Sequence, residues 1–402
     1  MSIIINLPGA NRGSVPYSIN TNTAPWRAHI KRSGTNAPQF NRIAYSAAHV
    51  VSDPLAKQNP WLDCALDWDA TINYRRHLLS LGMGIAEAMD TAQRGMGLDW
   101  PTSLQLISRT IDAAKDFSGA RVASGCGTDH LAPEAALSIE DIIRAYEEQM
   151  AAIENVGGKL IIMASRALVQ VAKNADDYIR VYERILSQAK EPVILHWLGD
   201  MFDPALKGYW GSNDIDTAMA TALSVIASQP NKVDGIKISL LDKDKEIAMR
   251  RKLPACVRMY TGDDFNYAEL IAGDGVGSSE NQQQSDALLG IFDAIAPAAN
   301  AALNQLSKGD VASFKAILEP TVPLSRHIFE APTRFYKTGV VFMAWLNGHQ
   351  EHFTMVGGQQ STRSITHLAE LFTLADQAGL LDKPELAAQR MKSLLATHGV
   401  AQ

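Results

Sequence analysis

The sequence predicts an α/β protein built on a (β/α)8 barrel, the TIM barrel, with an N-terminal arm and extra C-terminal helices. Two observations lead to this fold class. From about residue 40 onward, short apolar or β-branched runs alternate with longer segments of helical periodicity, a pattern typical of βα units and a parallel sheet. Eight such units can be counted, and eight parallel strands close a barrel of this kind.

The elements follow in order along the chain. Residues 1–40 are rich in Asn, Ser and Pro and are expected to form an extended arm. Strands are expected at residues 42–50, 84–90, 120–125, 159–165, 192–197, 233–239, 256–262 and 274–279. The barrel should therefore occupy residues 41–300. Residues 301–402 should form a helical extension packed on it, with a polar loop at 352–364 over the barrel.

Two of the intervening helices carry recognisable start signals. Ser138 precedes a helical segment and is followed three residues later by Asp141, which resembles a capping box. Asn174 and Asp177 repeat this arrangement before the next helical segment. These signals support strands that alternate with helices.

The composition excludes disorder and argues against nucleic-acid and membrane partners. Of 402 residues, 46% are hydrophobic and 20% are charged, which is enough apolar mass for a large core. Lys and Arg number 37 against 43 Asp and Glu. The resulting net charge of −6 provides no basic field that would attract phosphates or an anionic membrane surface.

The cysteines and the N-terminus predict a cytoplasmic protein. Cys64, Cys126 and Cys256 are far apart and have no CxxC or Cys/His ligand spacing, so neither a disulfide scaffold nor a zinc module is expected. The N-terminus lacks the basic lead of a signal peptide. No run of about 18 apolar residues predicts a membrane span.

Lys237 is the most informative polar residue, because the active site of a TIM barrel lies at the carboxyl ends of its strands. In KVDGIKIS, alternation places Ile236 and Ile238 outward and Lys237 inward. Desolvation there would lower the pKa of the amine from about 10.4 and make it a nucleophile toward a carbonyl. A lumen lysine paired with Asp263 or Glu280 is the alternative, and residue type alone does not separate the two.

The same region resembles a known family. VDGIKIS, followed by MYTGDDFNYAELIAGDGVGSSEN from Met259 to Asn281, is similar to the dihydrodipicolinate synthase and N-acetylneuraminate lyase superfamily of class I aldolases. In that superfamily the reactive lysine lies in a GIK strand, and its spacing to the GDD turn and the GDGV strand matches. The resemblance covers residues 42 to about 300. It implies that Lys237 forms a Schiff base and that the chain is a homo-oligomer, a dimer or tetramer.

The resemblance also implies a proton relay at the fifth strand. The superfamily ends this strand in Leu-Tyr-Asn, whose tyrosine moves protons, and PVILHWLGD puts His196 in that place. An imidazole with a pKa of about 6.5 suits this task. Trp197 beside it could stack on a sugar face. A hydrogen-bonded core histidine is the alternative for His196.

The loop after the second strand departs from the superfamily pattern. Residues 82–98 align with a Gly-Thr-Thr-Gly-Glu segment, but Asp90 replaces the first glycine and Ala92 the second threonine, and only Thr91 is kept. In the superfamily this loop holds the carboxylate of a pyruvate unit, which an aspartate repels. The arginine that some relatives carry after the fifth strand is replaced by Asp200. A neutral keto-sugar, and a role in carbohydrate metabolism, are therefore predicted.

The strand ends offer mainly hydrogen-bond acceptors, which suit the hydroxyl groups of a polyol. The expected substrate-binding residues are Asp90, Thr91, Asp129, His130, Arg166, Trp197, Asp263, Asp264, Ser278 and Glu280. Helix capping is the alternative for Asp263 and Asp264. A loop salt bridge is the alternative for Asp129 and His130.

The leading hypothesis is a lyase of the class I aldolase type. Lys237 would form an imine with a small keto substrate and break or form an adjacent C–C or C–O bond, while His196 moves protons. No cofactor beyond this covalent imine, and no metal, is expected. Two alternatives stay open: a metal-dependent sugar isomerase or lyase, and a non-catalytic sugar-binding regulator. The metal ligands would be His49, Glu87, Asp90, His130 and His196, although no HxH or HExxH spacing is present.

Overall fold

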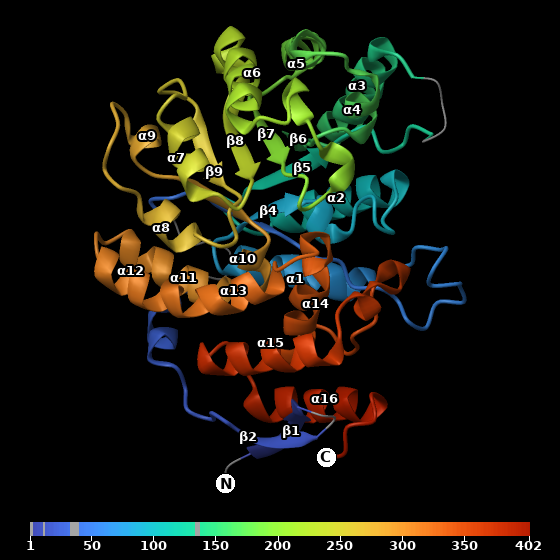
Figure 1. The fold of residues 1–402 in the computed structure, drawn as a ribbon, viewed down its shortest axis with the longest axis vertical. Helices are drawn as coiled ribbons and strands as arrows, with labels where there is room; N and C mark the ends of the chain where they lie inside the picture. Colours follow the sequence, from blue (N-terminus) through green and yellow to red (C-terminus); the bar gives the residue numbers. More distant parts are fainter. Residues whose placement is uncertain (1–2, 11–12, 33–39, 133–136) are drawn as a thin grey trace.

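The computed structural model describes residues 3–10, 13–32, 40–132 and 137–402, and its centre is a closed barrel of eight parallel strands (Figure 1). The strands are β3 (Ala44–Ala47), β4 (Gly84–Glu87), β5 (Val122–Cys126), β6 (Lys159–Ile162), β7 (Val193–Leu198), β8 (Val233–Ser239), β9 (Arg258–Thr261) and β10 (Asp286–Leu289). Each strand pairs with the next, and β10 closes the ring on β3. The predicted fold class is confirmed.

Helices follow the strands and surround the barrel. They are α1 (Trp68–Ser80), α2 (Trp100–Ala114), α3 (Ile139–Asn155), α4 (Arg166–Val171), α5 (Ala175–Gln188), α6 (Ile215–Ser228), α7 (Lys243–Arg250), α8 (Tyr267–Ala272), α9 (Glu280–Gln283) and α10 (Ile291–Ala294). The predicted capping box of α3 is confirmed, because Asp141 N–H donates to Ser138 Oγ and Ser138 N–H donates to Asp141 Oδ2. Asn174 caps α5 by accepting from the backbone of Asp177.

The eighth strand does not lie where the sequence predicted it. Residues 274–279 form a loop before α9 instead of a strand. Gly273, Gly275 and Gly277 have φ angles of 80°, 67° and 152°, which a regular strand does not adopt. The strand is the next apolar run, β10, whose four residues are buried. The prediction was wrong because glycines at alternate positions of this run favour turns over a regular strand.

The chain after the barrel is helical. It comprises α11 (Ala296–Leu306), α12 (Val311–Leu318), α13 (Val322–Ile328), α14 (Tyr336–Leu346), α15 (Ile365–Gln377) and α16 (Pro384–Thr397). Every residue of α14 is buried, as expected for the largely apolar sequence YKTGVVFMAWL. α14 packs on α10, the short helix that follows β10 (Figure 1). The first residues of α14 thereby reach the carboxyl end of the barrel.

The N-terminal segment is more ordered than an extended arm. β1 (Ile3–Pro8) and β2 (Ser14–Ile19) form an antiparallel hairpin. The hairpin packs beside α15 and α16, so the two ends of the chain lie close together (Figure 1). Tyr17 Oη donates to Asp376 of α15 at 2.7 Å. The hairpin differs from the predicted arm because Pro16 lies in an edge strand, where the missing N–H donor is tolerated.

The polar stretch at 352–364 lies at the carboxyl end of the barrel. Its central part, Val356–Thr362, is a 3-10 segment that contacts α14. Gln93, in the loop after β4, donates its side-chain amide to Val356 O at 2.7 Å. The C-terminal extension therefore meets the loop that follows β4. Within the described residues, no helix is long and apolar enough to cross a membrane.

Candidate active site

Four ionisable side chains meet at the carboxyl end of the barrel. Lys237 on β8 and His196 on β7 are register partners in adjacent strands. Asp90 follows β4, and Asp264 follows β9. Lys237, His196 and Asp264 are buried, whereas Asp90 is partly exposed. Asp90 and Asp264 both act electrostatically on Lys237, and Lys237 acts on His196, so the four groups form one cluster.

Lys237 points into the lumen, as alternation predicted. Ile236 and Ile238 pack in the layer between strands and helices, while Lys237 is 5% exposed. Gly262 makes room for it, because a Cβ there would lie 2.7 Å from Cε of Lys237. Burial lowers the pKa of the amine, against the opposing charges of Asp90 and Asp264. In the described part of the chain no hydrogen bond or ion pair engages Nζ, and burial favours its neutral, nucleophilic form.

Asp264 is a carboxyl group that stays protonated at neutral pH. Burial raises its pKa to about 8, and the nearby charges of Asp263 and Asp90 add to this, against a backbone hydrogen bond and the charge of Lys237. Its Oδ1 accepts the backbone N–H of Ile291 at 2.9 Å, which fixes the orientation of the carboxyl group. A group in this state can give up a proton and take it back near pH 7.

Asp263, the neighbour of Asp264, has a structural role. Its Oδ1 accepts the backbone N–H groups of Phe265 at 2.8 Å and Asn266 at 3.0 Å, and its Oδ2 accepts the amide of Asn266 at 2.8 Å. The capping alternative therefore describes Asp263. The prediction of a substrate contact at Asp263 is replaced by this turn, since both oxygens are engaged locally.

Asp90 is held as a carboxylate by groups from both halves of the chain. Burial opposes ionisation, but the charges of Lys337, Lys237 and His196 and a hydrogen bond outweigh it and lower the pKa to about 2. The hydrogen bond comes from Tyr336, whose hydroxyl lies 2.6 Å from Asp90 Oδ2. The same hydroxyl lies 2.7 Å from Thr91 Oγ1. Tyr336 therefore ties the loop after β4 to α14.

Lys337 is a second buried lysine at this end of the barrel. Burial lowers its pKa to about 8, against the charges of Asp90 and Asp203. Its Nζ donates to Arg334 O at 3.1 Å and lies 4.5 Å from the centre of the Tyr336 ring. Lys337 is thus anchored where its charge compensates Asp90.

Tyr336 and Lys337 are not among the predicted site residues, although the sequence carries a signal for them. They open a helix whose remaining residues are almost entirely apolar, and such a helix is buried. Polar side chains at the end of a buried helix need partners inside the protein. The sequence does not reveal that these partners are Asp90 and Thr91, because the contacts join segments about 246 residues apart.

His196 does not titrate near neutral pH as its residue type suggested. Burial and the charge of Lys237 lower its pKa to about 3, against the charge of Asp90. The ring is therefore a neutral imidazole. Within the described residues, its buried Nε2 has no hydrogen-bond partner, which leaves one polar atom for a ligand.

A cavity of about 760 Å³ opens over the carboxyl ends of β4 to β7. Asp90 and His196 line it, and Lys237 lies next to both. Three more predicted residues line it: Asp129, His130 and Arg166. The cavity thus connects the buried cluster with the loops that follow four strands.

The predicted residues around the cavity already have protein partners. Arg94, which the sequence did not single out, donates to both oxygens of Asp129 at 2.6 and 2.9 Å. Arg166 donates to Asp203 at 2.5 Å. His130 lies 3.1 Å from Glu148. The salt-bridge alternative therefore describes Asp129 and His130.

Comparison with known proteins places the whole chain in one family. The family described as "Protein of unknown function (DUF993)" matches residues 5–400. The chain belongs to the DUF993 family. Among curated proteins, none matches this sequence.

Several solved structures similar to this DUF993 chain are dihydrodipicolinate synthase family members. A putative dihydrodipicolinate synthetase from Pseudomonas aeruginosa has a TM-score of 0.57 at 15% identity, covering 82% of this chain and 99% of its own. A prophage protein of this family from E. coli K12, solved with pyruvate, has a TM-score of 0.59 at 14% identity, with 92% and 99% covered. The 4-hydroxy-tetrahydrodipicolinate synthase of Methylacidiphilum fumariolicum SolV has a TM-score of 0.59 at 14% identity, with 89% and 99% covered. The resemblance found in the sequence is confirmed at the level of the fold.

The DUF993 structure corrects three predicted substrate contacts besides Asp263. Trp197 is 2% exposed and packs edge-on against Trp210 in the outer layer, because it alternates with the inward His196. It cannot stack on a substrate in the lumen. Ser278 and Glu280 are exposed in the segment that precedes β10, at the amino end of the barrel. These two residues were misplaced together with the eighth strand.

The residues of the metal-dependent alternative do not gather at one point. His49 Nδ1 lies 2.8 Å from Asp293, and Glu87 forms a buried ion pair with Arg75 at 2.9 Å. Among the described residues, these side chains form no group with metal-ligand spacing. The strand ends therefore do not support a metal site built from them.

Proposed function

We propose that this DUF993 chain is a Schiff-base lyase in which Lys237 forms an imine with the ketone of a small, sugar-derived substrate. An adjacent C–C or C–O bond is then cleaved or formed. The observation that most directly supports this proposal is the state of Lys237. It is a buried amine with a lowered pKa and no hydrogen-bond partner in the described residues. The fold is consistent with a class I aldolase or lyase.

Imine formation uses Lys237 and Asp264. Nζ attacks the carbonyl carbon, and a proton moves from nitrogen to oxygen to give a carbinolamine. The Asp264 carboxyl group, whose pKa is about 8, then protonates the hydroxyl, which leaves as water. The products are a protonated imine on Lys237 and the Asp264 carboxylate.

For C–C cleavage, the same carboxylate works as a base. Asp264 takes the proton of a hydroxyl on the second carbon from the imine carbon. The bond between that carbon and the first carbon breaks, and the electron pair of the bond forms an enamine on Lys237. An aldehyde is released. Asp264 returns its proton to the enamine carbon, and water hydrolyses the imine to regenerate the amine and the acid.

His196, Asp90 and Tyr336 position the substrate in this proposal. Because His196 is neutral and its buried Nε2 has no partner in the described residues, it can form a hydrogen bond with a substrate hydroxyl. Asp90 is held by Tyr336 and keeps its charge at neutral pH, so it accepts from a second hydroxyl. The two acceptors flank Lys237.

The lining of the cavity favours a neutral polyhydroxylated ketone. Among its described lining residues, the two arginines, Arg94 and Arg166, both pair with aspartates, and no lysine is present. A substrate carboxylate would find no free cation there, whereas hydroxyl groups find acceptors in Asp90 and His196. One structural neighbour was solved with pyruvate, which supports a keto compound as the ligand class.

Reduction of the imine tests this proposal. The full chain is incubated with borohydride and single members of a panel of neutral ketoses and 2-keto acids, and its intact mass is measured. We expect a stable added mass with a neutral ketose and none with pyruvate. An adduct with 2-keto acids alone would contradict the substrate class. Calorimetric binding of a sugar without any adduct would contradict the lyase and favour a binding protein.

A further inference from the structure

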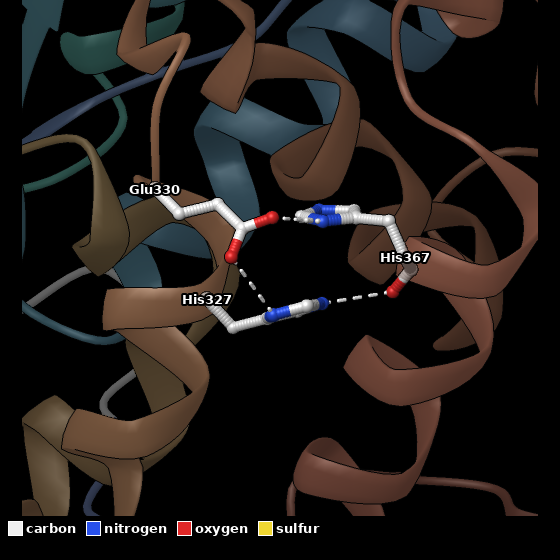
Figure 2. A group of neighbouring side chains, drawn as sticks. All are labelled: His327, Glu330 and His367. Carbon is white, nitrogen blue, oxygen red and sulfur yellow. Dashed lines mark hydrogen bonds and ion pairs between the residues drawn. The ribbon is translucent and has the colours of Figure 1, made fainter.

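A group of three side chains lies in the C-terminal extension, outside the barrel site. Figure 2 shows His327 at the end of α13, Glu330 in the turn that follows and His367 in the first turn of α15, all facing one another. Glu330 Oε1 lies 2.9 Å from Nδ1 of His367, and Glu330 Oε2 lies 3.5 Å from Nδ1 of His327. The two imidazole rings stack with centroids 4.0 Å apart. One carboxylate thus bridges two imidazoles.

The hydrogen bonds of His327 determine which of its nitrogens is free. Its Nε2 lies 2.9 Å from the backbone carbonyl of His367 and must donate to it. In the neutral ring, Nδ1 then carries a lone pair, and this lone pair faces the Glu330 carboxylate. An imidazole that donates its second nitrogen to a backbone carbonyl is the common arrangement of metal-bound histidines.

Two acceptors face each other in this group unless a cation lies between them. Nδ1 of His327 and Oε2 of Glu330 both carry lone pairs, so their contact is repulsive in the neutral state. A cation that binds both lone pairs removes this repulsion. One divalent ion between the three side chains can reach the facing ligand atom of each, because these atoms lie close together.

His367 is able to present its Nδ1 lone pair as well. Without an ion, its Nδ1–H donates to Glu330 Oε1 at 2.9 Å. Its Nε2 is buried and, within the described residues, has no hydrogen-bond partner, so the ring can carry its proton on Nε2 when Nδ1 binds an ion. Arg363 donates to Glu330 O at 2.7 Å and fixes the backbone of the turn. The ligand atoms of the three residues lie within 4.8 Å of one another.

We propose that His327, Glu330 and His367 bind a divalent transition-metal ion, with Zn²⁺ as the preferred species. Two imidazole nitrogens and one carboxylate oxygen suit Zn²⁺, Co²⁺ and Ni²⁺, whereas Mg²⁺ and Ca²⁺ prefer oxygen ligands. Ligands about 2.0 Å from a tetrahedral ion are roughly 3.3 Å apart, close to the 2.9 and 3.5 Å contacts at Glu330. Glu330 is 49% exposed, which leaves the fourth position to water.

The bound ion cross-links α13 to α15. α13 also carries Ser325, whose hydroxyl donates to the backbone carbonyl of Asp264 at 2.5 Å. The ion therefore stabilises the helix that holds the loop of Asp264. Its role is structural, because no substrate-facing group lies among its ligands.

Cobalt titration of the untagged full chain, freed of metals by a chelator, tests the site. We expect one equivalent of Co²⁺ to bind, with the visible absorption of a nitrogen- and oxygen-ligated ion, and Zn²⁺ to displace it. Zn²⁺ should also raise the Tm. Glu330→Gln and His367→Ala should each weaken binding by roughly 100-fold. The exposed controls Glu319→Gln and His398→Ala should bind as the parent does.

Three outcomes would overturn the proposal. The first is no stoichiometric Co²⁺ binding by the parent chain. The second is unchanged binding in Glu330→Gln, a half-exposed position where the substitution preserves size and leaves folding intact. The third is weaker binding in His398→Ala, which would show adventitious binding by surface histidines. The Tm in chelator reports whether each variant is folded.

Discussion

The barrel and the C-terminal extension each supply one buried lysine at the same end of the molecule, and the two lysines differ in what holds the amine. Lys237 of the barrel has no hydrogen bond to its Nζ in the described residues. Lys337 of the extension donates to Arg334 O and lies over the Tyr336 ring. Burial lowers the pKa of both.

The difference separates a nucleophile from a fixed charge. An amine without a partner can leave its position to attack a carbonyl, whereas an anchored amine mainly provides a positive field. Among the groups that lower the pKa of Asp90, Lys337 has the largest effect. The extension therefore prepares the site in which the barrel lysine reacts.

Exchange of each lysine for arginine should give the largest contrast. Lys237→Arg keeps a charge but cannot attack a carbonyl, so turnover should fall by roughly 10⁴-fold or more. Lys337→Arg keeps the positive field near Asp90 and should cost less than about 10-fold. Steady-state kinetics on the best ketose of the panel measures both. Equal losses in the two variants would contradict the division of roles.

The two neighbouring aspartates give the next contrast. Asp264→Asn removes the proposed acid and should lower turnover by roughly 10²–10⁴-fold. In the parent chain kcat/KM should fall as the pH rises through about 8, because Asp264 then loses its proton. Asp263→Asn weakens a turn and should cost stability of about 1 kcal/mol without moving that pH profile. If the pH profile of kcat/KM in Asp264→Asn is the same as in the parent chain, Asp264 is not the acid.

Replacement of His196 should slow turnover without preventing capture of the substrate. His196→Ala removes a hydrogen-bond acceptor for a substrate hydroxyl, and a loss of roughly 10²-fold is expected while the imine still forms. His196→Tyr should recover part of the rate. If His196→Ala turns over the substrate at the parent rate, the role of His196 is structural.

The smallest effect is expected from the link between the two regions. Tyr336→Phe removes the hydrogen bonds to Asp90 and Thr91 and should reduce turnover by about 10-fold and stability by about 1–3 kcal/mol. Tyr267→Phe, which removes the contact of another buried tyrosine with Thr321, is the matched control. It should lower stability alone, as urea unfolding and kinetics would report. A loss of activity in both variants would indicate a general loss of packing.

The sequence predicts the barrel half of the site and not the half from the extension. Lys237 follows from strand alternation, a local property that the structure preserves. The same rule places Trp197 outward, because Trp197 alternates with the inward His196. The predicted substrate contact of Trp197 does not follow this rule. Tyr336 and Lys337 depend on the docking of a helix about 246 residues beyond Asp90. No periodicity in a single sequence specifies such a contact.

Peptide mapping of the reduced imine tests the central claim most directly. The full chain is treated with borohydride and the ketose that gives an adduct, digested, and analysed by mass spectrometry. The account predicts that the added mass lies on the peptide that contains Lys237, persists in Lys337→Arg and is absent in Lys237→Arg. An adduct on Lys337, or one that survives in Lys237→Arg, would contradict it.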